Sequence, residues 1–476
     1  MNNVFVVGVE NNVLKKTFQK LVKKKNIRII STITTNKYTS KKTIQFIEAS
    51  LYDLDYLAQN FQDNNPLNSH IIKNFRNTEI NFYKMMDRIA IRFESIREIS
   101  ILYNRLLECF INFFQNHNIN TIIYENTPHF PVQLMIFDIC KYLKIKTIVI
   151  QRTDIDNYYI LKHDLFPKKM IPTNQVDNNS YDIENYFNIN NKSYWNKRST
   201  SLNNQSLKLH SDKMVINLFI FIKIFLKVIY QEFFHILNNE SIFYYKKLSI
   251  FNRIYYKYNY ILKFQNINSY VNKLSVQPNL KIKYIYFALH FQPERSTLPE
   301  GGIFVDQFLC LQILSNSISK DTKIYVKEHP RQIDLFPDLR RYNSRDLNFY
   351  KEISKLENVQ FVKTDFNSDL LLKNAFINST VTGSLGSDSI KYKIPTIIFS
   401  HTWYSSCGVC KVVSSVAECR EAIRFLSKLS PSKIKNQITA FKKNVKKYLF
   451  KSNINNSNII LNQNELYLNL KENLKN

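Results

Sequence analysis

The sequence predicts an α/β protein with two units, each built on a mainly parallel sheet. Apolar runs of the length of buried strands alternate with helical segments over residues 4–151, and the same alternation begins again at residue 282. Such alternation favours parallel strands joined by right-handed crossovers. A chain of 476 residues is also too long for one compact core, so two domains with additional helices are expected.

The N-terminal unit is expected to span residues 1–152. Its strands are short and apolar, and its first helix is amphipathic. Helical periodicity is sustained over residues 83–114, which predicts one long helix there. The other predicted elements are a strand at 4–9, a helix at 12–25, strands at 27–33 and 121–125, a helix at 131–143 and a strand at 146–151.

Residues 153–275 are expected to form a loop-rich and helical insert. Residues 153–212 are rich in Asn, Asp, Lys and Ser and have weak periodicity, which is typical of long loops. The stretch 215–237 is the most apolar, and its length would suit a membrane span. Lys223 and Lys227 in its middle would be costly in hydrocarbon, so a buried or interfacial helix is expected instead. The Lys, Tyr and Phe residues that continue to 263 would suit docking on an anionic membrane surface, although packing against the protein core is slightly favoured.

The second α/β unit is expected to span residues 276–428. Its predicted strands lie at 284–289, 323–327, 359–362, 375–378 and 396–399, and its helices at about 304–318, 346–356, 369–373 and 387–392. Residues 429–476 are expected to form a basic helix followed by an Asn-rich, frayed tail.

The net charge of +28 suggests anionic partners such as nucleic acid, phospholipid head groups or nucleotides. The heavy use of Lys, Asn, Ile, Tyr and Phe resembles an AT-rich coding bias, so part of this charge is expected on solvated surfaces. We find no Arg-rich patch with interleaved aromatic residues, so nucleic acid is not expected as a partner. Six scattered cysteines and no secretory signal favour a reduced cytoplasmic compartment. No second pair completes a zinc site with Cys407 and Cys410.

Glycine is rare in this chain and concentrated in its C-terminal half. There are six glycines, of which five lie between residues 301 and 408. Each is expected to meet a backbone need, either a positive φ or the close approach of a ligand. The same window holds three polar segments that directly follow predicted strands: FQPE at 291–294, KEHP at 327–330 and VTGSLGSD at 381–388. Polar loops at the carboxyl ends of consecutive strands form the ligand crevice of an open α/β sheet, so we expect the site there.

The KEHP segment places a histidine where a strand ends, because Pro330 stops the strand that Lys327 closes. His329 can donate a hydrogen bond to a phosphate oxygen and supplies charge when protonated. Lys327 and Arg331 add positive potential beside it. A lone histidine is more often structural, but this neighbourhood favours an anion site.

The VTGSLGSD segment combines two flexible turns with the start of a helix. Backbone N–H groups and the helix dipole then point at whatever lies there. The candidate donor-binding residues in this loop are Thr382, Gly383, Ser384, Gly386, Ser387 and Asp388. Asp388 could accept from a ribose hydroxyl, or merely favour the helix N-terminus. Together with His329, the loop predicts a site for the phosphate of a nucleotide.

Carboxylates near this crevice are candidates for the chemical step. Glu294 follows the first strand of the second unit and could act as a general base toward an acceptor hydroxyl, or as a nucleophile. The competing interpretation is a loop acid that pairs with Arg295. In the N-terminal half, Glu125 and His129 follow a strand end and could face the same cleft from the acceptor side.

These segments resemble the capsule polysaccharide biosynthesis family, which includes the Kdo transferases that start capsule chains on a lipid. The resemblance is carried by YFALHFQPERSTLPEGG, KIYVKEHPRQ and VTGSLGSDSIKYKIPTIIFSHTWYSSCGV, and by YENTPHFP at 124–131. It is specific across 282–410 and fair at 121–151, and it is absent at 153–265 and after 425.

The resemblance implies a GT-B-like fold, in which two Rossmann-like domains face a cleft. It places the donor sugar nucleotide in the C-terminal domain and the acceptor in the N-terminal one. The His-Pro pair that contacts the donor phosphate in the family falls on His329 and Pro330. The family's Gln and acid fall on Gln292 and Glu294, and its Ser/Thr-Gly loop on 382–387. Asp388 stands where the family often has a Glu that faces the ribose. Its side chain is one methylene shorter than that of the Glu in the family.

The expected function is therefore that of a glycosyltransferase in surface polysaccharide assembly, with a CMP- or NDP-activated sugar as donor and a glycan or glycolipid as acceptor. No tightly bound cofactor or metal is expected, because fixed hydrogen-bond donors and a helix N-terminus can stabilise the leaving phosphate. The expected location is the cytoplasm, with possible peripheral attachment to the inner membrane. The alternatives are a polyol-phosphate transferase or sugar-nucleotide epimerase of similar fold, and a non-catalytic factor for capsule assembly or export.

Overall fold

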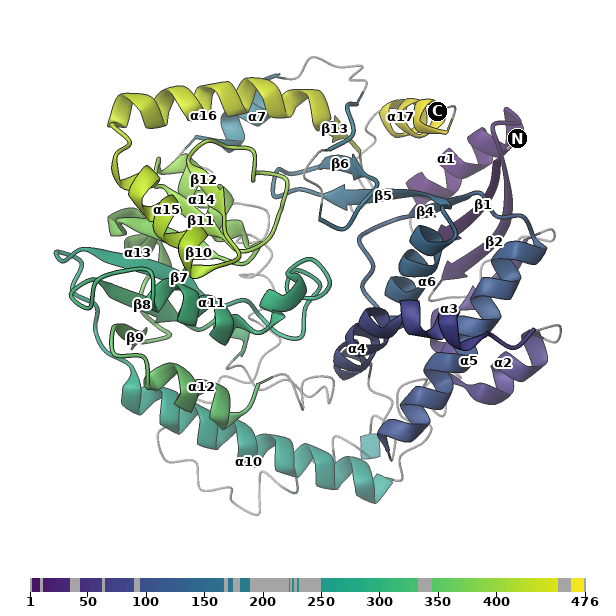
Figure 1. Ribbon diagram of the computed structural model, residues 1–476, viewed down its shortest axis with the longest axis horizontal. Helices are drawn as coiled ribbons and strands as arrows, with labels where there is room; N and C mark the ends of the chain where they lie inside the picture. Colours follow the sequence, from purple (N-terminus) through teal and green to yellow (C-terminus); the bar gives the residue numbers. More distant parts are fainter. Residues whose placement is uncertain are drawn as a thin grey trace.

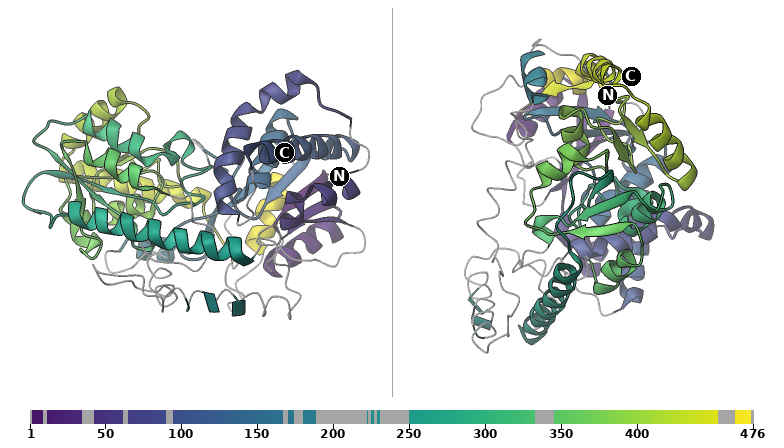
Figure 2. Two further views of the ribbon diagram at one scale, coloured as in Figure 1. Left: turned by 90° about the horizontal axis from the view of Figure 1, so that it is seen from below. Right: turned by 90° about the vertical axis from the view of Figure 1, so that its left-hand side faces the viewer.

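The structure is a computed structural model of the chain with two α/β domains side by side (Figure 1). The N-terminal domain lies on the right of that view and the C-terminal domain on the left, and Figure 2 shows the same two bodies from other directions. The structure describes residues 2–8, 12–34, 43–61, 65–89, 95–166, 170–173, 180–188, 222, 225–226, 229–230, 250–332, 345–452 and 464–474.

The N-terminal domain is built on a seven-stranded sheet in the order β13-β6-β5-β4-β1-β2-β3. The strands β1 to β5 are parallel, whereas β6 and β13 are antiparallel to their neighbours. The strands are β1 (Asn2–Val7), β2 (Ile27–Thr34), β3 (Ile44–Ile47), β4 (Thr121–Tyr124), β5 (Lys146–Arg152), β6 (Tyr158–Lys162) and β13 (Phe450–Lys451). The helical elements are α1 (Asn12–Lys23), η1 (Glu48–Tyr52), α2 (Leu54–Asn60), α3 (Ser69–Asn74), α4 (Arg76–Met85), η2 (Met86–Arg88), α5 (Ile96–Asn116), α6 (Pro131–Tyr142) and α17 (Asn464–Asn473).

The C-terminal domain is built on a six-stranded, fully parallel sheet in the order β12-β11-β10-β7-β8-β9. The strands are β7 (Tyr284–Ala288), β8 (Lys323–Lys327), β9 (Val359–Val362), β10 (Ile377–Thr380), β11 (Thr396–Ile398) and β12 (Cys410–Val412). The helical elements are α10 (Ile250–Leu274), η4 (Gly302–Val305), α11 (Gln307–Ser315), η5 (Pro330–Gln332), α12 (Leu347–Ser354), α13 (Ser368–Asn374), α14 (Ser384–Lys391), α15 (Val416–Ser427), α16 (Pro431–Val445) and η7 (Lys446–Tyr448). The helix α7 (Ser180–Tyr186) packs against this domain through Tyr186 and Trp403, whose ring centroids are 6.3 Å apart.

Both sheets reverse their strand order at the first strand of the domain. The N-terminal sheet turns between β1 and β4, and the C-terminal sheet turns between β7 and β10. A parallel sheet that is wound in both directions leaves a crevice at the carboxyl ends of the two strands that flank the reversal. The prediction of an α/β fold with two parallel-rich, Rossmann-like domains is thus confirmed.

Each sheet is buried on both faces, which explains why its strands are continuously apolar. In the N-terminal domain, Phe5 on β1 meets Phe114 on α5 with ring centroids 5.1 Å apart. In the C-terminal domain, Ile285 and Phe287 of β7 pack in the cluster that contains α11 and α12, whereas Tyr284 and Tyr286 pack in the cluster that contains α13. Burial of side chains of this size contributes roughly 1.5–3 kcal/mol each, so these faces dominate the stability of the two domains.

The prediction of one long helix over 83–114 is wrong. Helix α4 ends at Met85, a 3-10 turn ends at Arg88, and α5 begins at Ile96 after Ser95. The Ser95 hydroxyl accepts from the Glu98 amide at 3.3 Å and so caps the new helix. Hydrophobic periodicity continues on both sides of the break because both helices cover the same core, which hides the break in the sequence.

Two other segments are more ordered than the sequence predicts. Within the expected loop region, Tyr158 to Lys162 form the buried strand β6. The expected frayed tail contains β13, which pairs with β6, and α17, whose Leu466 and Leu470 are fully buried. The chain thus crosses back from α16 to the N-terminal domain, where α17 lies beside α1 (Figure 1).

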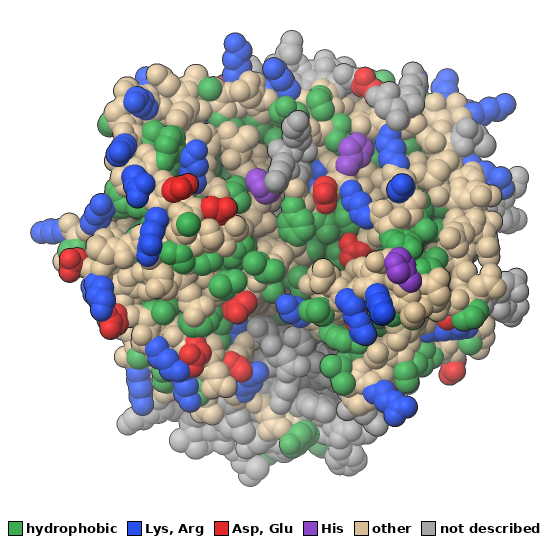
Figure 3. All heavy atoms as spheres, in the orientation of Figure 1, with side chains coloured by type: hydrophobic (Ala, Val, Ile, Leu, Met, Phe, Trp, Pro, Cys, Tyr) green, Lys and Arg blue, Asp and Glu red, His purple; other side chains and the backbone are tan. Residues whose placement is uncertain are grey.

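Most of the apolar stretch 215–237 lies outside the described residues, so the structure does not test its expected packing or membrane contact. Within the described part of the chain, no helix is both long and apolar enough to cross a membrane. Lys and Arg side chains are spread over both domains on the face shown in Figure 3, with acidic side chains among them.

Candidate functional site

His290 stands at the crevice of the C-terminal sheet, where the strand order reverses. It follows β7, and its side chain is buried against the end of β10. The ring nitrogen Nε2 lies 2.9 Å from Thr380 Oγ1 and 3.2 Å from the backbone nitrogen of Thr382. The two loops at the reversal point are therefore joined directly by this histidine.

The hydrogen bonds of His290 define its protonation state. The Thr382 amide can only donate, so Nε2 must accept, and the proton of a neutral ring lies on Nδ1. Nδ1 lies 3.1 Å from Ser296 Oγ, and the Ser296 hydroxyl donates to Glu294 Oε2 at 2.9 Å. Burial, helped by the positive charge of Arg345, lowers the pKa of His290 to about 3, which agrees with a neutral ring. A directed chain of hydrogen bonds thus runs from the Thr382 amide to the Glu294 carboxylate.

The Glu294 carboxylate ends this chain and has a perturbed pKa. Burial raises its pKa, while the Ser296 hydrogen bond and the charges of Arg295 and Arg88 lower it in part. A carboxylate whose pKa is raised by burial but which still accepts a hydrogen bond is suited to take a proton near neutral pH. Glu294 does not form the ion pair with Arg295 that the competing interpretation of the sequence predicts, because Arg295 faces Glu300, with Nε 3.6 Å from Oε2.

The buried neutral His290 should make the protein less stable in acid. The pKa of His290 is about 3 in the folded protein against 6.5 in the unfolded chain, so the folded state binds fewer protons between these pH values. This contribution is fully present above pH 6.5 and is lost as the pH falls below it. Between pH 7.5 and pH 5.5 we expect a loss of about 1.4 kcal/mol that His290→Gln does not show. Urea unfolding of the wild type and of His290→Gln at the two pH values measures this loss in the free energy of unfolding. An equal loss in both proteins would contradict the neutral state assigned to His290.

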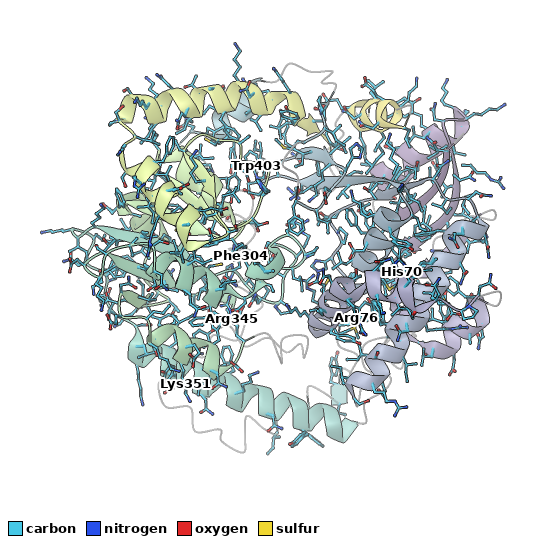
Figure 4. The ribbon with its side chains drawn as sticks, in the orientation of Figure 1. His70, Arg76, Phe304, Arg345, Lys351 and Trp403 are labelled. Carbon is cyan, nitrogen blue, oxygen red and sulfur yellow. The ribbon has the colours of Figure 1, made fainter. Side chains whose placement is uncertain are left out.

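A buried ion pair holds the loops after β7 and β8 together. Glu328 and Arg345 are both almost fully buried, and Arg345 Nη1 donates to both carboxylate oxygens of Glu328. The Tyr350 hydroxyl donates to Glu328 Oε2 at 2.7 Å. Arg345 also donates to the His290 carbonyl and, at 3.3 Å, to Gln292 Oε1. Figure 4 shows Arg345 on the side of the C-terminal domain that faces the N-terminal domain. This arginine therefore fixes the backbone beside His290 and the side chain of Gln292.

The residues near β8 that the sequence predicts to bind the donor nucleotide differ in their burial and contacts. His329 lies half-buried in the loop after β8, with its ring centroid 5.5 Å from that of Phe291. Lys327 is buried, and its Nζ donates to Ser368 Oγ at 2.7 Å, next to Asp365 and Asp369. Burial lowers the pKa of Lys327 to about 8. The side chain of Arg331 lies outside the described residues. Between Lys327 and His329, whose side chains are both described, His329 is the one that lies in the loop at the crevice edge.

The loop after β10 leads directly into helix α14. Thr382 Oγ1 donates to the Ser296 carbonyl at 2.6 Å, which ties this loop to the Glu294 loop. Gly383 is the N-cap residue, and because it has no side chain it cannot cap the amides of the first turn. A Cβ there would come within 3.1 Å of His290 Nε2 and 2.8 Å of Thr380 Oγ1, so the close approach explains the glycine. Helix α14 therefore begins at the crevice without a side-chain cap, and Ser384 is its first residue.

The remaining loop residues face protein partners. A Cβ at Gly386 would come within 2.4 Å of the Tyr404 ring, so close packing accounts for this glycine. The Ser387 hydroxyl is buried and donates to Asp154 Oδ2 at 2.6 Å. Asp388 pairs with Lys391 at 2.9 Å, and burial raises its pKa to about 6. A role in donor binding remains a prediction for these three residues, and it would require their present contacts to change.

Glu125 occupies the corresponding reversal point of the N-terminal sheet. It follows β4 and packs over Gly8, where a Cβ would come within 2.9 Å of the carboxylate. Asn126, next in the chain, accepts a hydrogen bond from Arg295 of the Glu294 loop. His129 is exposed, and its backbone amide donates to Gln133 Oε1 at 2.8 Å. The loop that carries Glu125 and His129 thus touches the loop that carries Glu294.

A cavity of about 380 Å³ lies on the same side of the C-terminal sheet. Its polar lining includes Gln292 and Arg345 from the crevice and the capping carboxylates of two helices, Asp306 of α11 and Asp346 of α12. The full lining is Lys263, Gln292, Val305, Asp306, Arg345, Asp346 and Phe349. Gln292 is therefore positioned between the hydrogen-bonded core of the site and open space.

The family match covers the part of the chain that forms this site. Residues 228–440 match the family described as capsule polysaccharide biosynthesis protein. No curated protein matches the chain in sequence.

The solved structures that are similar to this chain have low sequence identity to it. They include UDP-GlcNAc 2-epimerase from Methanocaldococcus jannaschii, with 12% identity, 93% of this chain and 100% of that chain covered, and a TM-score of 0.24. KpsC, a beta Kdo 2,7 transferase from Thermosulfurimonas dismutans, has 11% identity, coverage of 86% and 98%, and a TM-score of 0.31. A glycosyltransferase from Rickettsia africae has 11% identity, coverage of 100% and 97%, and a TM-score of 0.26.

The structure adds several residues to those that the sequence suggests. His290 and Ser296 join Glu294 to the loop after β10, and Arg345 and Glu328 hold the loops in place. His290 could have been found, since it is a polar residue directly after the apolar run that ends at Leu289. Within the described part of the chain, no group of three or more His, Cys, Asp or Glu side chains could hold a metal ion.

Proposed function

We propose that this protein is a glycosyltransferase of capsule polysaccharide biosynthesis that transfers a sugar from a CMP- or NDP-activated donor to a glycan or glycolipid acceptor. The observation that carries the proposal is the hydrogen-bonded chain from Thr382 through His290 and Ser296 to Glu294 at the reversal point of the C-terminal sheet. These hydrogen bonds link an ionisable carboxylate to the loop that begins α14, a helix whose N-terminus has no side-chain cap. All of these residues lie within the segment that matches the family.

In the proposed reaction, one group of residues stabilises the leaving phosphate and another removes the proton of the acceptor. The N-terminus of α14 and His329 stabilise the negative charge that develops on the leaving phosphate. Glu294 takes the proton of the acceptor hydroxyl as that oxygen bonds to the anomeric carbon of the donor sugar. Ser296 donates to one carboxylate oxygen and so leaves the other available for the acceptor.

The acceptor is proposed to bind from the N-terminal side. Glu125 and His129 lie in the loop that contacts the Glu294 loop through Asn126 and Arg295. An acceptor held there would reach a donor at α14 without leaving the region between the two reversal points.

A binding panel with product analysis tests the proposal. CMP, UDP, GDP and their sugars are screened by thermal shift, because ligands that bind the native state raise the melting temperature. Isotope-labelled donors are then incubated with glycan and glycolipid acceptors. A labelled, elongated acceptor supports the proposal. An isomerised nucleotide-sugar would identify an epimerase instead, a transferred polyol phosphate would identify a polyol-phosphate transferase, and binding without turnover would identify a non-catalytic assembly factor.

His329→Ala should weaken nucleotide binding by roughly 1.5–3 kcal/mol, the range for a hydrogen bond to a charged group. The reason is the position of His329 at the carboxyl end of β8, on the same sheet edge as α14. Calorimetric titration with the best nucleotide of the panel measures the change. His70→Ala is the matched control, because His70 is an exposed histidine of the N-terminal domain (Figure 4). Equal affinities of the two variants would remove His329 from the site.

A further inference from the structure

Arg88 is a buried cation of the N-terminal domain that reaches into the C-terminal domain. It is the last residue of η2 and is 5% exposed. Its Nη1 donates to the His129 carbonyl at 2.9 Å, and its Nη2 donates to the Glu294 carbonyl at 2.9 Å and to the Leu298 carbonyl. One guanidinium therefore holds the acceptor-side loop and the Glu294 loop at a fixed separation.

The chemistry of these partners explains why an arginine stands here. Three backbone carbonyls in two directions require several donors in a rigid planar arrangement, which a lysine ammonium does not supply. None of these three partners is a carboxylate, and the guanidinium keeps its positive charge. That charge contributes to lowering the pKa of the nearby Glu294 carboxyl, which burial raises.

A second set of contacts anchors the same loop to the N-terminal sheet. Glu300 accepts from Lys162 Nζ at 3.4 Å and from Gln151 Nε2 at 3.1 Å, and these residues stand on β6 and β5. Both Lys162 and Glu300 are buried. With Arg88 at one end and Glu300 at the other, the segment 294–300 is held by the domain to which it does not belong in sequence.

We propose that Arg88 is a positioning residue, through which the N-terminal domain sets the Glu294 loop relative to the acceptor-side loop at 126–129. The inference rests on the proposed function, in which Glu294 acts on an acceptor bound from that side. It predicts that sugar transfer depends on Arg88, whereas nucleotide binding at α14 and His329 does not. Hydrolysis of the donor by water should also depend less on Arg88, because water needs no placement by the N-terminal domain.

Amide hydrogen exchange of the full-length protein without any ligand is the first test. Arg88→Met should accelerate exchange at amides of residues 297–301 by about tenfold or more and leave the strands of both sheets unchanged. Arg76→Met is the matched control, since the Arg76 side chain is 67% exposed and pairs with Glu79 on its own helix. Unchanged exchange in this loop would overturn the proposal whether or not the protein is a glycosyltransferase.

Kinetics are the second test, with the donor and acceptor that the labelled screen identifies. Arg88→Met should lower kcat for transfer by about tenfold or more, because small misplacements of reacting groups are costly, with the affinities for CMP and UDP unchanged. The charges that face Glu294 are Arg88, Arg295 and Glu300. Loss of the Arg88 cation should raise the pKa of Glu294 and move the acid limb of the kcat/KM profile to higher pH.

Arg88→Lys separates positioning from charge, and it serves as the second variant if Arg88→Met folds poorly. It keeps the cation but loses the planar set of donors, so the acid limb should stay in place while the transfer rate still falls. Normal transfer by both variants, together with normal loop exchange, would overturn the inference. An inactive wild-type protein with the expected exchange pattern would instead contradict the proposed function and leave the positioning role supported.

Discussion

Glu294→Gln should lower kcat for sugar transfer by ~10²-fold or more, which is within the usual contribution of a positioned general base. The amide keeps the shape of the side chain and can still accept from Ser296, but it cannot take a proton. The affinity for the nucleotide should change little, because α14 and His329 are proposed to bind the phosphate. Single-turnover rates and calorimetric titration with CMP and UDP measure the two quantities separately.

Glu357→Gln is the matched control, since the Glu357 side chain is 72% exposed and precedes the amino end of β9, at the sheet edge opposite the crevice. Near-normal turnover of Glu294→Gln would transfer the role of base to another carboxylate. Glu125 is the next candidate, because it occupies the equivalent reversal point of the N-terminal sheet and its loop touches the Glu294 loop. A large effect of Glu125→Gln with a small effect of Glu294→Gln would reverse the proposed assignment.

Arg345→Met should destabilise the folded protein by about 3–5 kcal/mol, because it leaves the buried Glu328 carboxylate without its cation. The same substitution removes the hydrogen bonds to the His290 carbonyl and to Gln292 Oε1, so the loops of the crevice should loosen as well. Urea unfolding monitored by circular dichroism measures the free energy of unfolding.

The double variant Glu328→Gln with Arg345→Met should recover part of that loss, because no charge is then left buried without a partner. Lys320→Met is a suitable control, because it breaks an ion pair whose side chains are 84% and 72% exposed, and we expect no measurable change in stability. Equal destabilisation by the single and double variants would show that the charge of Glu328 is not what Arg345 compensates.

Most of the fold follows from local patterns that the sequence shows directly. β8 at Lys323–Lys327 and β9 at Val359–Val362 have the predicted bounds, and α6 ends one residue before its predicted end, because apolar runs and capping residues mark these elements. β6 forms an antiparallel pair with β5 just before it, and it was missed because the polar composition of residues 153–212 indicates loops. β13 was missed because it pairs with β6, almost three hundred residues earlier in the chain. Periodicity in a short window carries no information on such a pairing.

The candidate site was predictable where a polar residue directly follows a strand. His329 and the loop at 382–388 begin within two residues of a strand end, and so does His290, which was missed. Glu294 lies six residues after β7, in the loop that follows this strand. Arg345 and Arg88 could not be predicted, since each acts across many residues on backbone carbonyls, which have no sequence signature. The packed environment of Gly386, Ser387 and Asp388 depends on Tyr404 and Asp154, whose proximity only the tertiary structure reveals.

The return of the chain to the N-terminal sheet has a consequence for synthesis on the ribosome. β6 has β5 on one side and β13 on the other, and β13 is made roughly 290 residues after β6. At translation rates of about 5–20 residues per second, one edge of β6 in the nascent N-terminal domain stays unpaired for roughly 15–60 s before β13 is made. An unpaired edge is a template for association with other chains. The apolar surface that α17 later covers with Leu466 and Leu470 is bare over the same interval. We therefore expect this domain to need chaperone protection until residue 470 has left the ribosome.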